Sequence, residues 1–200
     1  MADKTDPDVR PEEERTRPPV LTVRAEFPSD LYRILPEISE LTQQRPRLNE
    51  SGLEYLLRLR SSTTPEEAVT FTAFAALPEL AVNWGYECLR AMAEHLNPQE
   101  RPLMEMIASW LSQPNTALRH RIARDALWAT SRAPSVFLGL GVAWSGGSVA
   151  PNDPVAPPPY RAPRAINSAV LSCLARSDLN RRPIYLARFI DLAEPLFRAY

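Results

Sequence analysis

The spacing of the prolines is the strongest constraint on how this chain folds. Pro65, Pro78, Pro114 and Pro134 each stand at or just before the start of an apolar pattern with helical spacing. Proline is tolerated in the first turn of a helix but disrupts a helix interior. Because 21 residues are proline and only 6 are glycine, the chain is expected to form short helices joined by tight turns.

Capping residues support several of these helix starts. Thr64 precedes Pro65, and Glu66 and Glu67 follow in the first turn, where acidic side chains suit the helix dipole. No segment alternates apolar and polar residues over a length that would predict a sheet. The expected helices cover approximately residues 29–44, 50–60, 68–76, 78–95, 98–111, 116–128, 134–144, 164–176 and 182–198.

These elements predict an all-α fold, an irregular bundle of about eight short helices with a Pro-rich strap before the last two. A helical-repeat solenoid is the alternative, because Pro65 and Pro98 are 33 residues apart and Pro78 and Pro114 are 36 apart. The residues between these prolines do not match, which favours the bundle. Residues 1–20 are charged and Pro-rich and are expected to form a disordered polar tail, which leaves 21–200 as a single helical domain.

Composition narrows the classes of function. The formal net charge is −1, so no overall positive field attracts nucleic acid. Cys88 and Cys173 each lie in an apolar helical pattern and are expected to be core thiols. The polar N-terminus has no secretory signal, and no segment approaches the roughly 18–20 apolar residues of a membrane span. We therefore expect a soluble, cytoplasmic protein.

Catalytic and cofactor motifs are incomplete in this sequence. Ser145 lies beside two glycines, but residues 143–147 lack the first glycine of a nucleophile elbow and follow a predicted helix instead of a strand. The two histidines, His95 and His120, lie among charged residues and are expected at the surface. Residues 139–141 do not complete a dinucleotide fingerprint, and no metal-binding motif is present. We therefore expect no enzyme, no cofactor, no metal and no small-molecule substrate.

Two groups of residues have ordinary structural interpretations. Trp84, Trp110 and Trp128 fall in apolar helical patterns and are expected to be core anchors. The densest basic stretch, from Arg119 to Arg132, points in several directions on a helix, so it is interpreted as a solvated face.

The segment from Trp144 to Arg164 has the least ordinary composition. Its glycine pair is followed by six prolines between Pro151 and Pro163. Connections in helix bundles typically have only about 2–8 residues, and a longer, stiff connection is more often functional. Residues 157–160 also match the P-P-x-Y ligand of WW domains, a pattern that is frequent by chance. The competing interpretation is that the segment only covers apolar surface of its own domain. The candidate partner-binding residues are Trp144, Ser145, Gly146, Gly147, Tyr160, Arg161, Arg164, Arg181 and Arg182.

Three blocks of sequence between about residues 60 and 175 resemble a family of bacterial helical proteins without an established activity. Genes of that family tend to sit in type VI secretion clusters. The most distinctive block is the Trp-Ser-Gly-Gly-Ser sequence that precedes the prolines. The blocks are residues 65–69 with 76–78 and 81–84, residues 108–110 with Pro114 and Arg119, and residues 143–151 with the proline run.

The resemblance implies an accessory role at the secretion machine. Adaptors and chaperones that load an effector onto the spike tip are cytoplasmic and non-catalytic, and they recognise protein surfaces. The partner would then be a secreted effector or a spike-tip component. The alternative is an immunity protein that neutralises a cognate toxin, although no strongly charged face or acidic loop is evident. A small serine hydrolase built around Ser145 is the second alternative.

Overall fold

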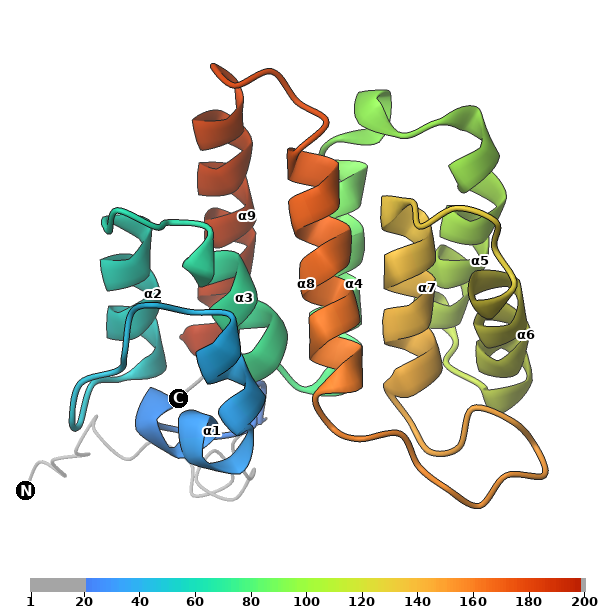
Figure 1. Cartoon of the computed structure of the whole chain (residues 1–200), viewed down its shortest axis with the longest axis horizontal. Coiled ribbons are helices and arrows are strands. Elements are labelled where there is room, and N and C mark those ends of the chain that lie inside the picture. Colours follow the sequence, from blue (N-terminus) through green and yellow to red (C-terminus); the bar gives the residue numbers. More distant parts are fainter. Residues whose placement is uncertain (1–20, 199–200) are drawn as a thin grey trace, which may run out of the picture.

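The computed structural model describes residues 21–198, and the predicted tail at residues 1–20 lies outside this range. The expectation of an all-α fold is confirmed, since these residues form nine α-helices (Figure 1) and no strand longer than the single bridge between Val23 and Ala76. The helices are α1 (Pro28–Ile34), α2 (Gly52–Arg60), α3 (Glu67–Ala75), α4 (Pro78–Arg90), α5 (Arg101–Ser112), α6 (Thr116–Leu127), α7 (Pro134–Trp144), α8 (Arg161–Leu174) and α9 (Arg182–Phe197). Short 3₁₀ segments are η2 (Pro36–Glu40), η3 (Ala93–His95) and η4 (Pro98–Glu100).

Proline opens many of these helices, as the sequence predicts. Pro78 and Pro134 are the first residues of α4 and α7. Side-chain caps begin others: Ser51 and Glu54 form a capping box at α2, and the Asn115 side chain accepts a hydrogen bond from the amide of Leu118 at α6.

Three predicted boundaries are wrong. The helix expected over residues 29–44 stops at Ile34, because Pro36 follows and cannot continue the hydrogen-bond ladder. The helix expected to reach His95 ends at Arg90 and gives way to η3. Helix α8 begins at Arg161 instead of Arg164, since Pro163 fits in its first turn.

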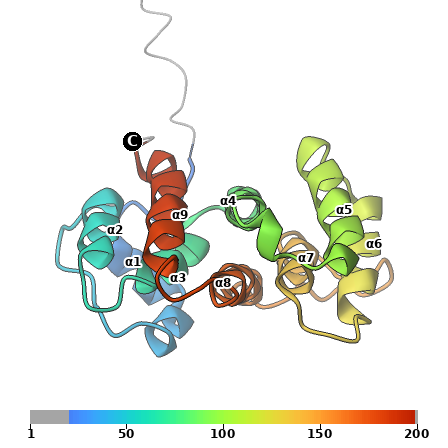
Figure 2. The same cartoon turned by 90° about the horizontal axis from the view of Figure 1, so that it is seen from above.

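Helices α4 and α8 lie next to each other in the middle of the molecule (Figures 1 and 2). Helices α1, α2, α3 and α9 gather on one side of this central pair, and α5, α6 and α7 gather on the other. One continuous apolar core runs through both groups. The arrangement is an irregular bundle, as the sequence predicts.

Two of the three tryptophans expected in the core are found there. Trp84 and Trp110 are each 3% exposed, and the Trp84 indole donates a hydrogen bond of 3.0 Å to the carbonyl of Phe189. The prediction for Trp128 is wrong, because this side chain is 83% exposed. It follows the last residue of α6 and is two positions beyond the buried Ala126, so it points about 200° away from the buried face.

Candidate functional site

The strap comprises residues 145–160 and connects α7 to α8. Helix α7 ends where the Ser145 hydroxyl turns back and donates a hydrogen bond of 2.8 Å to the carbonyl of Val142. Gly147 then adopts a φ of 63°, a conformation that residues with a side chain rarely accept. These two residues turn the chain sharply out of the bundle, which explains the glycine at position 147.

Most of the strap lies in solvent. Residues 150–156, Pro158 and Pro159 are all exposed, and Val155 is 68% exposed. Figure 1 shows the strap as an open loop at the end of α7 and α8. Most of this segment is therefore exposed and not packed into the apolar core.

One arginine–aromatic contact joins the two ends of the strap, and a second lies at its α8 end. The guanidinium of Arg161 lies 5.8 Å from the centre of the Trp144 ring, and that of Arg164 lies 5.6 Å from the centre of the Tyr160 ring. Trp144 and Tyr160 are half-buried and pack against the core. Trp144 thus anchors the base of the strap, and Arg164 also pairs with Glu40 of η2.

An apolar depression adjoins this base on the side of η2, α7 and α8. It has a volume of about 300 Å³, and Trp144 and Arg164 form part of its rim. The other lining side chains are mainly apolar and include Leu41, Phe137 and Leu140. The depression can accept an apolar side chain, and the Arg164 guanidinium at its rim is paired with Glu40.

A second cavity, the polar pocket, adjoins the base of the strap at Ser145 and Gly146. Its volume is about 220 Å³, and its other walls come from Glu79 of α4, Trp110 of α5 and the start of α6. The pocket therefore joins residues of the second and third sequence blocks, together with Glu79, which lies between the last two parts of the first block. Its lining residues are Glu79, Trp110, Pro114, Asn115, Thr116, Arg119, Ser145 and Gly146.

Arg119 corrects the interpretation of the basic stretch as a solvated face. Arg121, Arg124 and Arg132 are exposed, but Arg119 is only 8% exposed. Its Nη1 donates a hydrogen bond of 3.0 Å to the carbonyl of Ala143 at the end of α7. Burial lowers the pKa of the Arg119 guanidinium.

His120 is half-buried beside the strap, whereas the sequence placed it on the surface. Its Nε2 lies 3.3 Å from Nη2 of Arg119 and 3.3 Å from the carbonyl oxygen of Ser148. A neutral imidazole nitrogen is either a donor or an acceptor, so it can satisfy only one of these two groups at a time. Ser145 makes no hydrogen bond to this ring, so the pair does not form a nucleophile and base.

Arg181 and Arg182 are not brought to the strap. They lie at the turn between α8 and α9, at the opposite end of α8 (Figure 1). A helix of 14 residues is about 21 Å long. Arg182 donates a hydrogen bond of 2.9 Å to the carbonyl of Ala175, and Arg181 lies over the ring of Tyr185. Both side chains have local structural contacts, and the combined surface expected from the sequence does not form.

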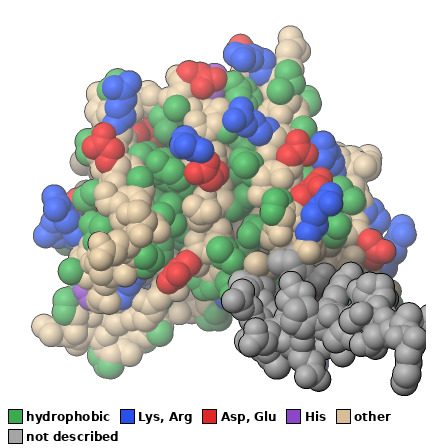
Figure 3. Space-filling view, turned by 180° about the vertical axis from the view of Figure 1, so that it is seen from behind, with side chains coloured by type: hydrophobic (Ala, Val, Ile, Leu, Met, Phe, Trp, Pro, Cys, Tyr) green, Lys and Arg blue, Asp and Glu red, His purple; other side chains and the backbone are tan. Residues whose placement is uncertain are grey.

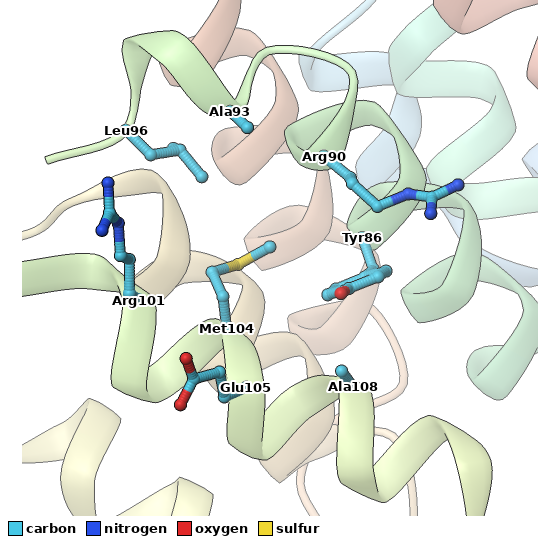
Figure 4. A pocket seen from close by; sticks show the side chains of 8 residues that line it. All are labelled: Tyr86, Arg90, Ala93, Leu96, Arg101, Met104, Glu105 and Ala108. Atoms are coloured by element: carbon cyan, nitrogen blue, oxygen red, sulfur yellow. The ribbon is translucent and has the colours of Figure 1, made fainter. Parts of the chain in front are cut away.

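An apolar groove between α4 and α5 was not foreseen from the sequence. Its volume is about 280 Å³, and Tyr86, Leu96 and Met104 converge on it (Figure 4). Figure 3 shows the molecule from behind, where apolar side chains gather among scattered charged groups. Arg90 at the groove is already paired with Glu87.

The two cysteines are buried free thiols, as expected. Burial raises the pKa of Cys173 to about 12, so this thiol stays protonated near neutral pH. Among residues 21–198, no group of three or more histidine, cysteine, aspartate or glutamate side chains could hold a metal ion. None of the helices in this range combines the length and apolar character needed to cross a membrane.

The fold and the strap define the class of protein: a helical bundle with one long, exposed, proline-rich connection. Residues 55–197 match the model of a family of unknown function, DUF6931, and the chain belongs to this family. No curated protein and no solved structure shows significant similarity to the chain.

Proposed function

We propose that this protein is a cytoplasmic, non-catalytic accessory factor that binds another protein. Its role would be that of an adaptor or chaperone for effector loading in a bacterial type VI secretion system. The partner would be a secreted effector or a spike-tip component, bound at the strap and at the depressions beside its base.

The observation that carries this proposal is the exposure of the strap. A connection that only closed the bundle could be short, or it could lie against the core. The strap is long, and its residues 150–156 are exposed. Prolines restrict the backbone before binding, so less conformational entropy is lost when a partner orders the segment.

The chemistry around the base of the strap suits a protein surface. The apolar depression can take an aliphatic or aromatic side chain, while the exposed Arg161, which makes no ion pair among the described residues, can receive a carboxylate at the base of the strap. Arginine and aromatic side chains are favoured in protein interfaces. The secretion context is supported by the resemblance of the three sequence blocks.

A double substitution in the strap tests the proposal. Val155→Asp with Arg161→Ala alters two exposed side chains and leaves the packed Tyr160 in place. Tagged protein would be recovered from its native host and bound proteins identified by mass spectrometry. We expect effector or spike-tip proteins with the wild type, at least about tenfold less of them with the double variant, and a melting temperature within about 4 °C of wild type, since the Arg161–Trp144 contact is lost.

Arg188→Ala is the matched control, because Arg188 is an exposed arginine on α9. It should leave capture unchanged. Equal capture by the strap variant and the control would contradict binding at the strap. Recovery of an adjacent-gene toxin would favour the immunity alternative instead.

A further inference from the structure

The polar pocket contains a buried cation without a neutralising anion. Arg119 is more than nine-tenths buried, yet no carboxylate among residues 21–198 lies within ion-pair distance of it. Burial is the cause that lowers its pKa, but a guanidinium remains charged at physiological pH. A buried charge is normally paired, because its removal from water is otherwise costly.

The known contacts of Arg119 use only part of its hydrogen-bonding capacity. An arginine has about five N–H donors. One bonds the carbonyl of Ala143 and a second is directed at His120. Both partners are neutral when the imidazole is uncharged, so they satisfy N–H groups without neutralising the cation. Arg119 is also one of the residues that line the polar pocket.

The start of α6 contributes to the same wall. Asn115 caps the amide of Leu118, while Thr116 begins the helix and lines the pocket. Arg119 lies one turn later on this helix, and helical side chains lean toward the N-terminus. The helix dipole therefore adds a positive potential to that of the guanidinium.

Gly146 leaves the entrance open. A Cβ atom placed on this residue would meet nothing within 4 Å. Gly146 therefore places no side chain in the way of an incoming group at this part of the pocket wall. The cavity of about 220 Å³ holds a carboxylate and the few atoms attached to it.

Glu79 limits which anions fit. Its exposed carboxylate lies on another wall of the pocket, beyond ion-pair distance from Arg119. A doubly charged phosphate would be repelled by it more strongly than a singly charged carboxylate. An amide N–H next to the carboxylate, as in a polypeptide, could also donate a hydrogen bond to Glu79.

We propose that the polar pocket binds a carboxylate of a partner polypeptide, held by Arg119 and the N-terminal turn of α6. This inference deepens the proposed function and rests on it only for the partner that carries the carboxylate. The carboxylate is either an aspartate or glutamate side chain or the C-terminal group of the partner. The Glu79 carboxylate favours a ligand group that has a single negative charge and an adjacent N–H donor.

Nuclear magnetic resonance with small probes tests the pocket separately from the strap. The full isotope-labelled chain would be titrated with N-acetylglycine, with N-acetylglutamate α-amide and with inorganic phosphate. The reporters are the Nε–H of Arg119 and the backbone amide of Gly146. We expect saturable shifts with at least one carboxylate probe; N-acetylglycine identifies a terminal carboxylate and the glutamate derivative a side chain.

Arg119→Met should weaken carboxylate binding by at least about tenfold, because a charge-assisted hydrogen bond is lost. Arg121→Met, an exposed arginine on the same helix, should leave it unchanged. Glu79→Gln keeps the fold, because Glu79 is exposed, and should strengthen binding roughly threefold or more by removing a negative charge. This second variant keeps the test decisive if Arg119→Met fails to fold.

The proposal is overturned if neither carboxylate probe shifts the reporters, if only phosphate does, or if a folded Arg119→Met variant binds as the wild type does. Unchanged affinity in Glu79→Gln would also overturn it. These results do not depend on capture of a partner by the strap, so the two proposals can fail independently.

Discussion

Glu100 is a buried carboxylate whose removal should cost much of the stability of the bundle. It ends η4, and its side chain is 5% exposed. Oε1 accepts hydrogen bonds from the amide of Asn97 and from Arg176, and Oε2 accepts one of 3.1 Å from the amide of Ser135. A single carboxylate thus joins η4, the first turn of α7 and the end of α8.

Glu100→Gln keeps the shape of this side chain but removes its charge. The amide NH₂ must replace one of the two oxygens, and it then faces at least one N–H donor without an acceptor. Loss of a charge-assisted bond costs about 1.5–3 kcal/mol, and an unsatisfied buried donor costs about 1–3 kcal/mol. Because the Arg176 side chain is 28% exposed and partly hydrated, we expect a loss of about 3 kcal/mol. This corresponds to a fall of roughly 6–12 °C in melting temperature for a chain of this length.

The stability difference should depend on pH. Burial raises the pKa of Glu100, but hydrogen bonds from Arg176, Ser135 and Asn97 lower it below its ordinary value overall. The contribution of the carboxylate is therefore complete above the unfolded-state pKa of about 4.3 and disappears as the pH falls through the folded-state pKa. The difference between wild type and Glu100→Gln should shrink in acid.

Urea denaturation followed by circular dichroism measures both effects. Glu87→Gln is the control, because Glu87 pairs with the exposed Arg90 and should change the free energy of unfolding by less than about 0.5 kcal/mol. A loss below about 0.5 kcal/mol for Glu100→Gln near neutral pH would refute the reasoning. So would a difference that stays constant down to about pH 3.

Two further comparisons use melting curves. Trp110→Ala should lower stability by about 3–5 kcal/mol because the side chain is buried, whereas Trp128→Ala should change it by less than about 0.5 kcal/mol; equal effects would contradict the assigned burial. Gly147→Ala should cost about 1–2 kcal/mol because of its positive φ, whereas Gly146→Ala, with open space at its Cβ, should remain within about 0.5 kcal/mol of wild type. A neutral Gly147→Ala would show that the turn is not fixed in this conformation.

The fold was predictable where proline and apolar spacing agree. Pro78 and Pro134 mark the first residues of their helices because both effects act locally on the backbone. The same rule predicts a break at Pro36, but the apolar residues on both sides of this proline favoured one continuous helix. Helix periodicity alone therefore overestimated the length of that element.

The candidate site was less predictable, because its residues come from distant segments. The exposure of Trp128 could be predicted only from the helical register, because Trp128 lies off the face formed by Ile122 and Ala126. Arg119 lies on that buried face, three residues before Ile122, so a signal for its burial was present. The arginine-rich composition of this stretch led instead to the prediction that Arg119 is exposed to solvent. Only the packing of α6 against α7 places this arginine behind the strap.

The strap extends from a base that packing holds in a fixed position. Helix α7 is buried from Pro134 to Ala143 except at Phe137, and a Cβ on Gly141 would lie 2.7 Å from Cγ1 of Ile166 in α8. Because these two helices are already in close contact, α7 cannot move toward α8 without a steric clash. The base of the strap, where Trp144 borders the apolar depression and Ser145 borders the polar pocket, thus keeps its position while the strap remains in solvent. A partner that binds both would meet preorganised cavities, so most of the ordering cost would fall on the strap, where proline reduces it.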